Sequence, residues 1–141
     1  MATEPKSAQE DMQRLLYLQS LYSKEYEAVM NEIANLSMTQ ATLARNIELL
    51  EHKDRLDNSR ILISGGGGTY IDANIKGIDR VLAYVGAGYL VEKDVEGAKK
   101  LIKENSDAGN EALKRLNEDR RKLEKEITNI QFAIESMQQG Q

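Results

Sequence analysis

Apolar residues recur in alternating steps of three and four residues along both flanks of this 141-residue chain. This spacing is the heptad pattern of helices that pair side by side as a coiled coil. In the first flank it predicts a helix over residues 8–57, which at 1.5 Å per residue would extend about 75 Å. Residues 1–7 are expected to be disordered. The seam of this helix consists of Met12, Leu15, Gln19, Tyr22, Tyr26, Val29, Ile33, Leu36, Gln40, Leu43, Ile47 and Leu50.

The second flank carries the same pattern and predicts a helix over residues 94–139. Asp94 provides its start, because a carboxylate at this position can accept a hydrogen bond from the free amides of the first turn. The two predicted helices are similar in length and are joined by a compact insert, so we expect them to pair in antiparallel fashion. The second seam consists of Ile102, Ser106, Gly109, Leu113, Leu116, Arg120, Leu123, Ile127, Ile130, Ile134 and Met137.

A register follows when the seam positions of the two helices are placed opposite one another. The predicted layers pair Leu15 with Ile134, Tyr22 with Ile127, Tyr26 with Leu123, Ile33 with Leu116, Leu36 with Leu113, and Ile47 with Ile102. The weak layers then coincide, because Gln40 meets Gly109 and Leu43 meets Ser106. We expect loose packing and bending at this place.

The insert between the helices changes to a period of two, which is typical of strands. We predict four strands, over residues 61–64, 69–75, 80–85 and 89–92. Glycine clusters at 65–68 and 86–88 supply the turns, where glycine accepts a positive φ without steric cost. The predicted fold class is therefore α+β: a long antiparallel two-helix coiled coil with two β-hairpins at residues 60–93, in a single domain over residues 1–141.

The predicted hairpins have apolar side chains on both faces and unpaired edges. Two-stranded hairpins are marginally stable alone, and open edges favour pairing with other strands. We infer that hairpins from several chains close into a shared sheet or barrel. The residues predicted to carry this oligomerisation are Ile61, Ile63, Tyr70, Ile71, Ile75, Val81, Leu82, Val85, Tyr89 and Val91.

Composition excludes several kinds of protein. With one Phe, no Trp and 30% charged residues, a thick globular core is not expected. The absence of cysteine excludes disulfides and thiolate zinc sites. No apolar run is long enough for a signal peptide or a membrane span, so we expect a cytoplasmic protein without a membrane partner. A net charge of −4 with interspersed signs argues against a nucleic-acid partner.

No combination of residues suggests catalysis, a metal site or a cofactor. The four glycines before Thr69 are followed by a strand, and phosphate-binding loops need a helix N-terminus at that point. His52 is the lone histidine, and a tetrahedral metal site would need further ligands. The paired carboxylates lie on convex helix surfaces without a pocket to shift their pKa. We therefore predict that the chain is not an enzyme.

The helix ends farthest from the insert are apolar beyond what a two-helix seam can bury. Exposed apolar patches of this kind mark binding surfaces, although a further helix could also cover them. The residues predicted to bind other polypeptides here are Leu15, Leu16, Tyr17, Leu18, Leu21, Ile130, Phe132, Ala133, Ile134 and Met137.

The segment GGGTYIDANIKGIDRVLAYVGAGYLVEKDVEGAKKLI, together with this layout, resembles the α-class subunit of archaeal prefoldin. The resemblance implies two hairpins per chain and a hexamer of two α and four β subunits, built on a double β-barrel platform. It also implies that the helix tips hold unfolded polypeptides and deliver them to a group II chaperonin without ATP. One departure concerns the first strand, where Ser64 and Gly65 stand in place of the usual Pro and apolar residue; it bears on the extent of that strand and not on the number of hairpins.

Two other functions remain open from the residues alone. The chain could be a structural or scaffolding coiled-coil adaptor whose β region is a dimerisation clasp. An enzyme that uses the glycine loops would have to bind a nucleotide, which we do not expect.

Overall fold

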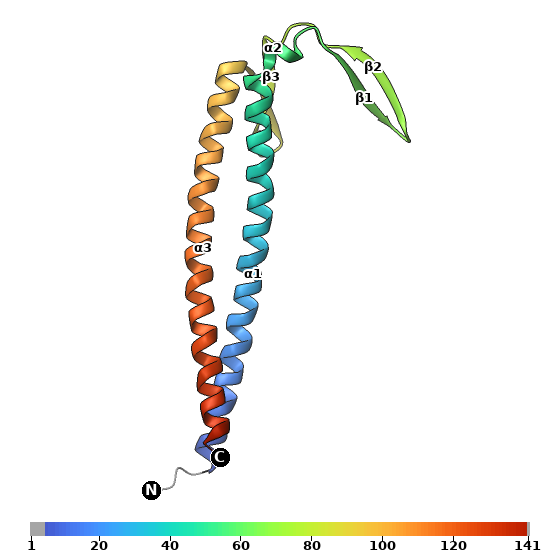
Figure 1. Cartoon of the computed structure of the whole chain (residues 1–141). Coiled ribbons are helices and arrows are strands. Elements are labelled where there is room, and N and C mark those ends of the chain that lie inside the picture. Colours follow the sequence, from blue (N-terminus) through green and yellow to red (C-terminus); the bar gives the residue numbers. More distant parts are fainter. Residues whose placement is uncertain (1–4, 141) are drawn as a thin grey trace. The chain divides into compact units, whose positions relative to one another are not determined.

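The computed structural model describes residues 5–140 (Figure 1). The chain divides into two compact units. The coiled-coil unit contains residues 5–38 and 110–140, and the hairpin unit contains residues 39–109. Two long helices and two β-hairpins in the order helix, hairpins, helix confirm the predicted α+β class. The elements are α1 (Pro5–Glu51), α2 (Lys53–Leu56), β1 (Arg60–Gly66), β2 (Thr69–Asn74), β3 (Arg80–Gly86), β4 (Tyr89–Asp94) and α3 (Val95–Gln139).

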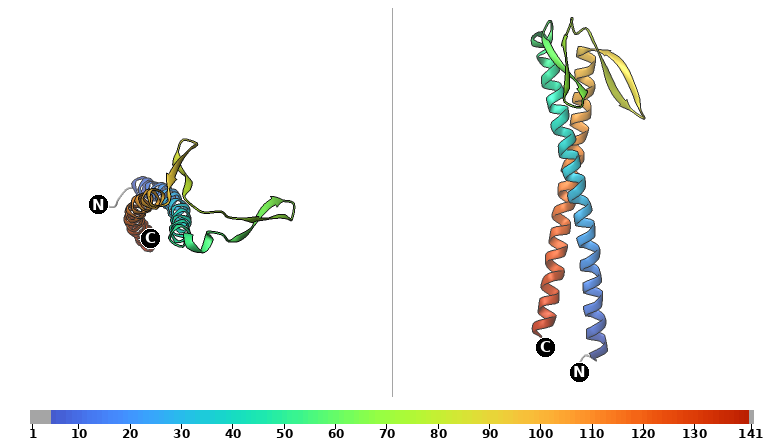
Figure 2. Two further views of the ribbon diagram at one scale, coloured as in Figure 1. Left: turned by 90° about the horizontal axis from the view of Figure 1, so that it is seen from above. Right: turned by 90° about the vertical axis from the view of Figure 1, so that its right-hand side faces the viewer.

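In the coiled-coil unit, α1 and α3 lie side by side and run in opposite directions (Figures 1 and 2). Every predicted seam residue of this unit is half-buried or buried, whereas most of the residues between them are exposed. Leu123, Ile130 and Ile134 are the most deeply buried of them. The heptad pattern therefore predicted the packed face correctly, because only residues spaced three and four apart stay on one side of a helix.

A chain of polar side chains crosses the seam of this unit. Tyr26 Oη donates a 3.2 Å hydrogen bond to Glu124 Oε1, which also accepts a 2.8 Å bond from Arg120 Nη1. Arg120 Nε in turn donates to Asn117 Oδ1 at 3.3 Å. Arg120 occupies a seam position and would be costly to bury without these acceptors. The contact of Tyr26 with Glu124 agrees with the predicted register, which placed Tyr26 opposite the neighbouring Leu123.

The hairpin unit has its own small core at the ends of the long helices. Leu50 of α1 packs with Val95 and Ala98 of α3, and all three are buried. The residues packed around this core are Ile78, Val81 and Ile102. The core therefore joins both helices to the linker between the hairpins and to β3.

Gln40 and Gly109 face one another in this unit, as the predicted register requires. Loose packing was predicted here, and the carboxamide of Gln40 in fact occupies the space beside Gly109, whereas Leu43 of the neighbouring layer lines an open groove. Gln40 Nε2 also donates a 2.7 Å hydrogen bond to the backbone oxygen of Ser106. The bending expected at this place stays a prediction.

The first long helix is shorter at its C-terminal end than predicted. It ends at Glu51, and His52 (φ −103°, ψ 32°) separates it from the short helix α2. The predicted stop at residues 57–59 is confirmed as the end of α2. There Asp57 Oδ1 accepts a 2.6 Å hydrogen bond from the amide of Ile78 in the linker between the hairpins. This contact between residues distant in sequence ties the helix end to the linker.

The other boundaries differ from the prediction by a few residues. Helix α1 begins at Pro5, since proline fits the first helical position, where its missing N–H has no partner to lose. The predicted disorder of residues 1–7 therefore fails for residues 5–7, and residues 1–4 lie outside the described part. Strands β1, β3 and β4 extend to Gly66, Gly86 and Asp94, and β2 ends at Asn74.

The two hairpins are separate two-stranded sheets with the same internal geometry (Figure 2). Arg60 lies opposite Asn74 in the first, and Arg80 lies opposite Asp94 in the second. Every strand pairing of the first hairpin recurs 20 residues later in the second hairpin. This includes the bulge, which lies between Ser64 and Gly66 in the first and between Tyr84 and Gly86 in the second. The hairpin region is therefore an internal structural repeat, which the sequence analysis did not identify.

Both hairpins turn through two residues with positive φ, as tight hairpin turns with the right-handed twist require. In the first these are Gly67 (φ 59°) and Gly68 (φ 80°), and in the second they are Ala87 (φ 52°) and Gly88 (φ 81°). Ala87 adopts a left-handed conformation that disfavours a side chain, so the second turn carries backbone strain that the first lacks.

Candidate functional site: two exposed apolar surfaces

The first exposed apolar surface lies on the coiled-coil unit near both chain ends. We use the name helix-end surface for the exposed side chains of Leu16, Tyr17 and Leu21 on α1 and Phe132 on α3. Tyr17 and Phe132 each lie opposite the seam of their own helix, so they face outward on different sides of the helix pair. Phe132 is 71% exposed and Tyr17 is 64% exposed. These side chains are exposed because they fall between the seam positions, so the partner helix does not cover them.

The other predicted binding residues lie in or beside the seam. Ile130 and Ile134 are 7% and 8% exposed, so they pack between the helices and offer almost no surface to another molecule. Half-buried positions are taken by Leu15, Leu18, Ala133 and Met137. The structure therefore separates the predicted set into an exposed surface and the packed seam beneath it. Binding by any of these residues stays a prediction.

The second exposed apolar surface belongs to the hairpins. Of the predicted oligomerisation residues, Ile61, Ile75 and Val81 are half-buried. The exposed ones are Ile63, Tyr70, Ile71, Leu82, Val85, Tyr89 and Val91. Three further exposed side chains, Leu62, Tyr84 and Leu90, were not predicted although the period of two could have identified them.

The strand register assigns these side chains to the two faces of each hairpin, because directly opposite residues share a face. In the first hairpin, Ile63 lies opposite Ile71 on an apolar face. In the second, Tyr84 lies opposite Leu90 on the face that also carries Leu82. Apolar side chains thus occupy exposed positions on both hairpins. Each strand pairs with only one other strand, so the outer edges of each hairpin have no strand partner within the described residues.

Each hairpin also carries one diagonal ion pair at the repeated position. Arg60 Nε donates a 2.7 Å hydrogen bond to Asp72 Oδ1, and Arg80 lies 3.7 Å from Glu92. The hydrogen bond with Asp72 raises the pKa of Arg60, and desolvation opposes this only in part. Both pairs are exposed to solvent, so they add little stability.

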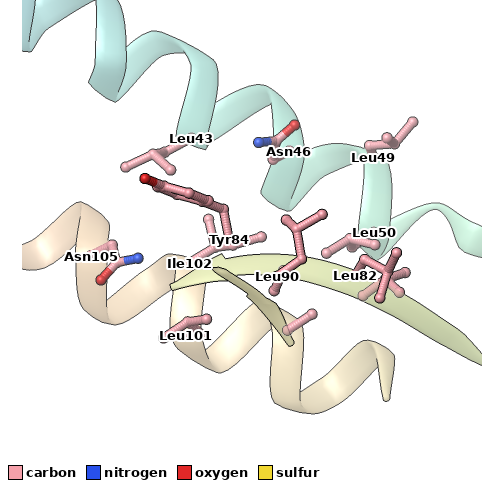
Figure 3. Close-up of a pocket in the computed structure, with 13 residues that line it drawn as sticks. Leu43, Asn46, Leu49, Leu50, Leu82, Tyr84, Leu90, Leu101, Ile102 and Asn105 are labelled. Atoms are coloured by element: carbon pink, nitrogen blue, oxygen red, sulfur yellow. The ribbon is translucent and has the colours of Figure 1, made fainter. Parts of the chain in front are cut away.

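The second hairpin forms one side of an open apolar groove of about 440 Å³ in the hairpin unit (Figure 3). Side chains from both long helices and from the hairpin face this groove, among them Leu43, Ile102 and Leu90. Leu82 also lines it and yet remains 67% exposed. The hairpin is therefore only partly covered by the helices of its own chain.

Within residues 5–140, no group of His, Cys, Asp and Glu side chains has the geometry of a metal site. None of the described helices combines the length and the apolar content needed to cross a membrane. His52 lies next to Arg45, Glu48 and Arg55 in a shallow surface depression, without a second imidazole or a thiolate. The described residues thus expose apolar side chains both on the coiled-coil unit and on the hairpins.

Comparison with known families decides between the kinds of protein that could carry such surfaces. The Prefoldin family, described as "Prefoldin subunit", matches residues 22–140, which includes both hairpins and most of both helices. The chain belongs to the prefoldin family. Prefoldin is a chaperone family, so the chain is a chaperone subunit.

Curated relatives refine this assignment to the archaeal type of α subunit. The prefoldin subunit alpha of Pyrobaculum calidifontis is 28% identical over 138 residues, which cover 92% of this chain and 96% of the relative. The prefoldin subunit alpha of Methanothrix thermoacetophila is 27% identical over 118 residues, which cover 83% of this chain and 77% of the relative. The prefoldin chain is therefore of the archaeal α class, as the resemblance implied.

A solved structure supports the prefoldin fold. The chain is similar to a chain in the cryo-EM structure of filamentous PFD from Methanocaldococcus jannaschii, with a TM-score of 0.55 and 25% identity. The match covers 84% of this chain and 93% of the other. The arrangement of long helices around two hairpins is thus that of a known prefoldin chain.

Proposed function

We propose that this chain is the α subunit of an ATP-independent holdase, which binds non-native polypeptides at the helix-end surface and transfers them to a group II chaperonin. The observation that carries the proposal is the exposure of Leu16, Tyr17, Leu21 and Phe132 near the ends of a coiled coil whose seam residues are half-buried or buried. Exposed apolar side chains that gather in one part of a molecule mark a binding surface.

Hydrophobic contact supplies the binding energy. Unfolded chains expose apolar side chains, and each one that is fully buried contributes roughly 1.5–3 kcal/mol. Contacts on a convex helix surface bury less than this. One subunit therefore binds a client weakly, and release does not need ATP.

Assembly makes the weak contacts effective. We propose that the hairpins join those of β-class prefoldin subunits in a β-barrel platform, giving an α2β4 hexamer. Support comes from the open outer edges of both hairpins and from their exposed apolar faces. Such strands are stabilised when they pair with others. Several helix ends on one platform then bind one client with high effective concentration.

A truncation tests the client-binding part of this proposal. We expect that deletion of the residues before Leu21 and after Ile130 abolishes suppression of client aggregation, while light scattering still shows the assembled oligomer. Unchanged suppression by the truncated oligomer would contradict a role for the helix ends. Loss of the oligomer would place the deleted residues in assembly instead.

Mixing experiments test the assembly part. The chain alone and the chain mixed with an archaeal β-class subunit are compared by light scattering. A mixed hexamer supports the holdase, whereas a stable homodimer that ignores the β-class subunit supports the scaffolding adaptor with a dimerisation clasp. Transfer is measured by adding a group II chaperonin to the loaded hexamer and following the labelled client, which should move to the chaperonin without ATP.

A further inference from the structure

One layer of the helix pair in the hairpin unit is polar and makes direct contact with the helix backbone. Gln40 Nε2 of α1 donates a 2.7 Å hydrogen bond to the backbone oxygen of Ser106 in α3. The same side chain lies over Gly109, where an added Cβ would stand 2.6 Å from Gln40 Cδ and 2.9 Å from Nε2. We call Gln40, Ser106 and Gly109 the glutamine layer.

Gly109 makes this contact possible. Glycine is the poorest helix former after proline, and Gly109 lies inside the 45-residue helix α3. Because it has no Cβ, it leaves the turn around the Ser106 carbonyl open to a side chain from the opposite helix. A Cβ at this position would require the carboxamide of Gln40 to move from the place where it bonds to Ser106.

We infer that the glutamine layer fixes the register in which α1 pairs with α3. A polar residue at a single seam position is a known way to specify register, because it finds its partner in only one alignment. Here the partner is the backbone carbonyl of Ser106, which Gln40 can reach because Gly109 has no side chain. In this register Gln40 is hydrogen-bonded. A shift by one heptad would place it against Ile102 or Leu116, where no glycine opens the backbone.

A one-heptad shift also changes the apolar layers. It brings Leu43 opposite Leu113 in place of Ser106, but it leaves Leu36 opposite Arg120 and Ile47 opposite Gly109. An unpaired carboxamide in an apolar layer adds a further penalty to the shifted alignment. The glutamine layer therefore adds to the preference for one register that the apolar seam provides.

The register also decides which residues of the two helices lie level with one another. A shift by seven residues would move one helix about 10 Å along the other. Leu16 and Tyr17 would then no longer lie level with Phe132, which would change the spacing of the exposed side chains at the helix ends. This consequence rests on the proposed function, whereas the register itself does not.

Engineered cysteine pairs in the full-length chain test the register directly, because the natural sequence contains no cysteine. Leu36→Cys with Leu113→Cys reports the native alignment, and Leu36→Cys with Arg120→Cys reports a shift by one heptad. We expect only the native pair to form a disulfide in the otherwise natural chain. In the Gln40→Ala, Gly109→Ala background, the shifted pair should increase about tenfold, as expected when a buried hydrogen bond no longer distinguishes two states.

Gln19→Ala is the matched control, since Gln19 is also a half-buried glutamine at a seam position of α1. It should leave the crosslinking pattern unchanged. If the shifted pair stays absent in the Gln40→Ala, Gly109→Ala background, the core around Leu50 and Val95 sets the register and the inference is overturned. Equal crosslinking of both pairs in the natural chain would also overturn it.

A double-mutant cycle tests the contact independently of crosslinking. Helix propensity alone makes Gly109→Ala favourable by about fivefold in the folding equilibrium constant. We expect a smaller gain in the natural chain, because the new Cβ displaces the carboxamide of Gln40 from its bond to Ser106, and the full gain in the Gln40→Ala background. The same gain in both backgrounds would contradict the contact on which the inference depends.

Discussion

The carboxylate of Asp94 accepts a 2.8 Å hydrogen bond from the backbone amide of Gly97, which lies three residues later in the sequence. Asp94 is the last residue of β4, and α3 begins at the next residue, Val95. The side chain thus caps the helix, as the sequence predicted, and one residue links the second hairpin to the second long helix.

Replacement of Asp94 by Ala should destabilise the folded chain by about 1 kcal/mol, the usual cost of losing a capping side chain. Asp94→Asn keeps an oxygen acceptor and should lose only part of this stability. Chemical denaturation followed by circular dichroism measures both variants. Equal stability of Asp94→Ala and the natural chain would show that the cap is not used.

The strained turn of the second hairpin gives a second prediction. Ala87→Gly should stabilise the chain by about 1 kcal/mol, because glycine adopts the φ of 52° without the steric cost that alanine bears. Ala83→Gly, in the middle of β3, is the control and should destabilise, because glycine weakens a strand. A loss of stability in Ala87→Gly would contradict the left-handed conformation of this residue.

The contact between Asp57 and the linker gives a third prediction. Asp57→Ala removes the acceptor for the Ile78 amide and should cost about 1–2 kcal/mol, because this half-buried amide loses its partner. Asp57→Asn keeps an acceptor oxygen and should behave nearly as the natural chain does. Hydrogen exchange at the Ile78 amide reads the contact directly, and its rate should rise only in Asp57→Ala.

The heptad seam was predicted almost residue by residue because it depends on spacing alone. The seam residues from Leu15 to Leu36 in α1 and from Leu113 to Met137 in α3 are half-buried or buried, as their period requires. The two hairpins were predicted for a similar reason, since glycine clusters and a period of two leave few alternatives.

The features that escaped prediction depend on contacts between distant residues. The first helix is interrupted at His52, close to the hydrogen bond between Asp57 and the amide of Ile78. The local sequence gives no signal that predicts this hydrogen bond. Ile130 and Ile134 were predicted both in the seam and among the binding residues, and their burial agrees with the seam assignment. The hairpin repeat escaped because few residues are identical between the two copies, namely Arg60, Leu62, Gly66 and Gly68 with the residues 20 positions later.

The ion pair between Glu96 and Lys99 gives a fourth prediction, about pH. The hydrogen bond with Glu96 raises the pKa of Lys99, with desolvation opposing it. Because the folded pKa is raised, the stabilisation is fully present below the ordinary lysine pKa of about 10.4 and is lost as the pH rises through the folded value. Glu96→Gln should lower the pKa of Lys99 in an NMR titration, whereas an unchanged pKa would show that the pair does not form in solution.

The central claim is that the helix-end surface binds non-native polypeptides, and a matched pair of double variants tests it most directly. Tyr17→Ser with Phe132→Ser removes two exposed side chains from this surface. Met30→Ser with Met38→Ser removes two exposed apolar side chains elsewhere on α1, where Met38 is 72% exposed. Binding of a labelled unfolded client to the assembled oligomer is then measured by titration. We predict that the first variant loses affinity by at least about tenfold, because two apolar contacts are removed, and that the second binds as the natural protein does. Equal affinity of both variants and the natural protein would contradict the account.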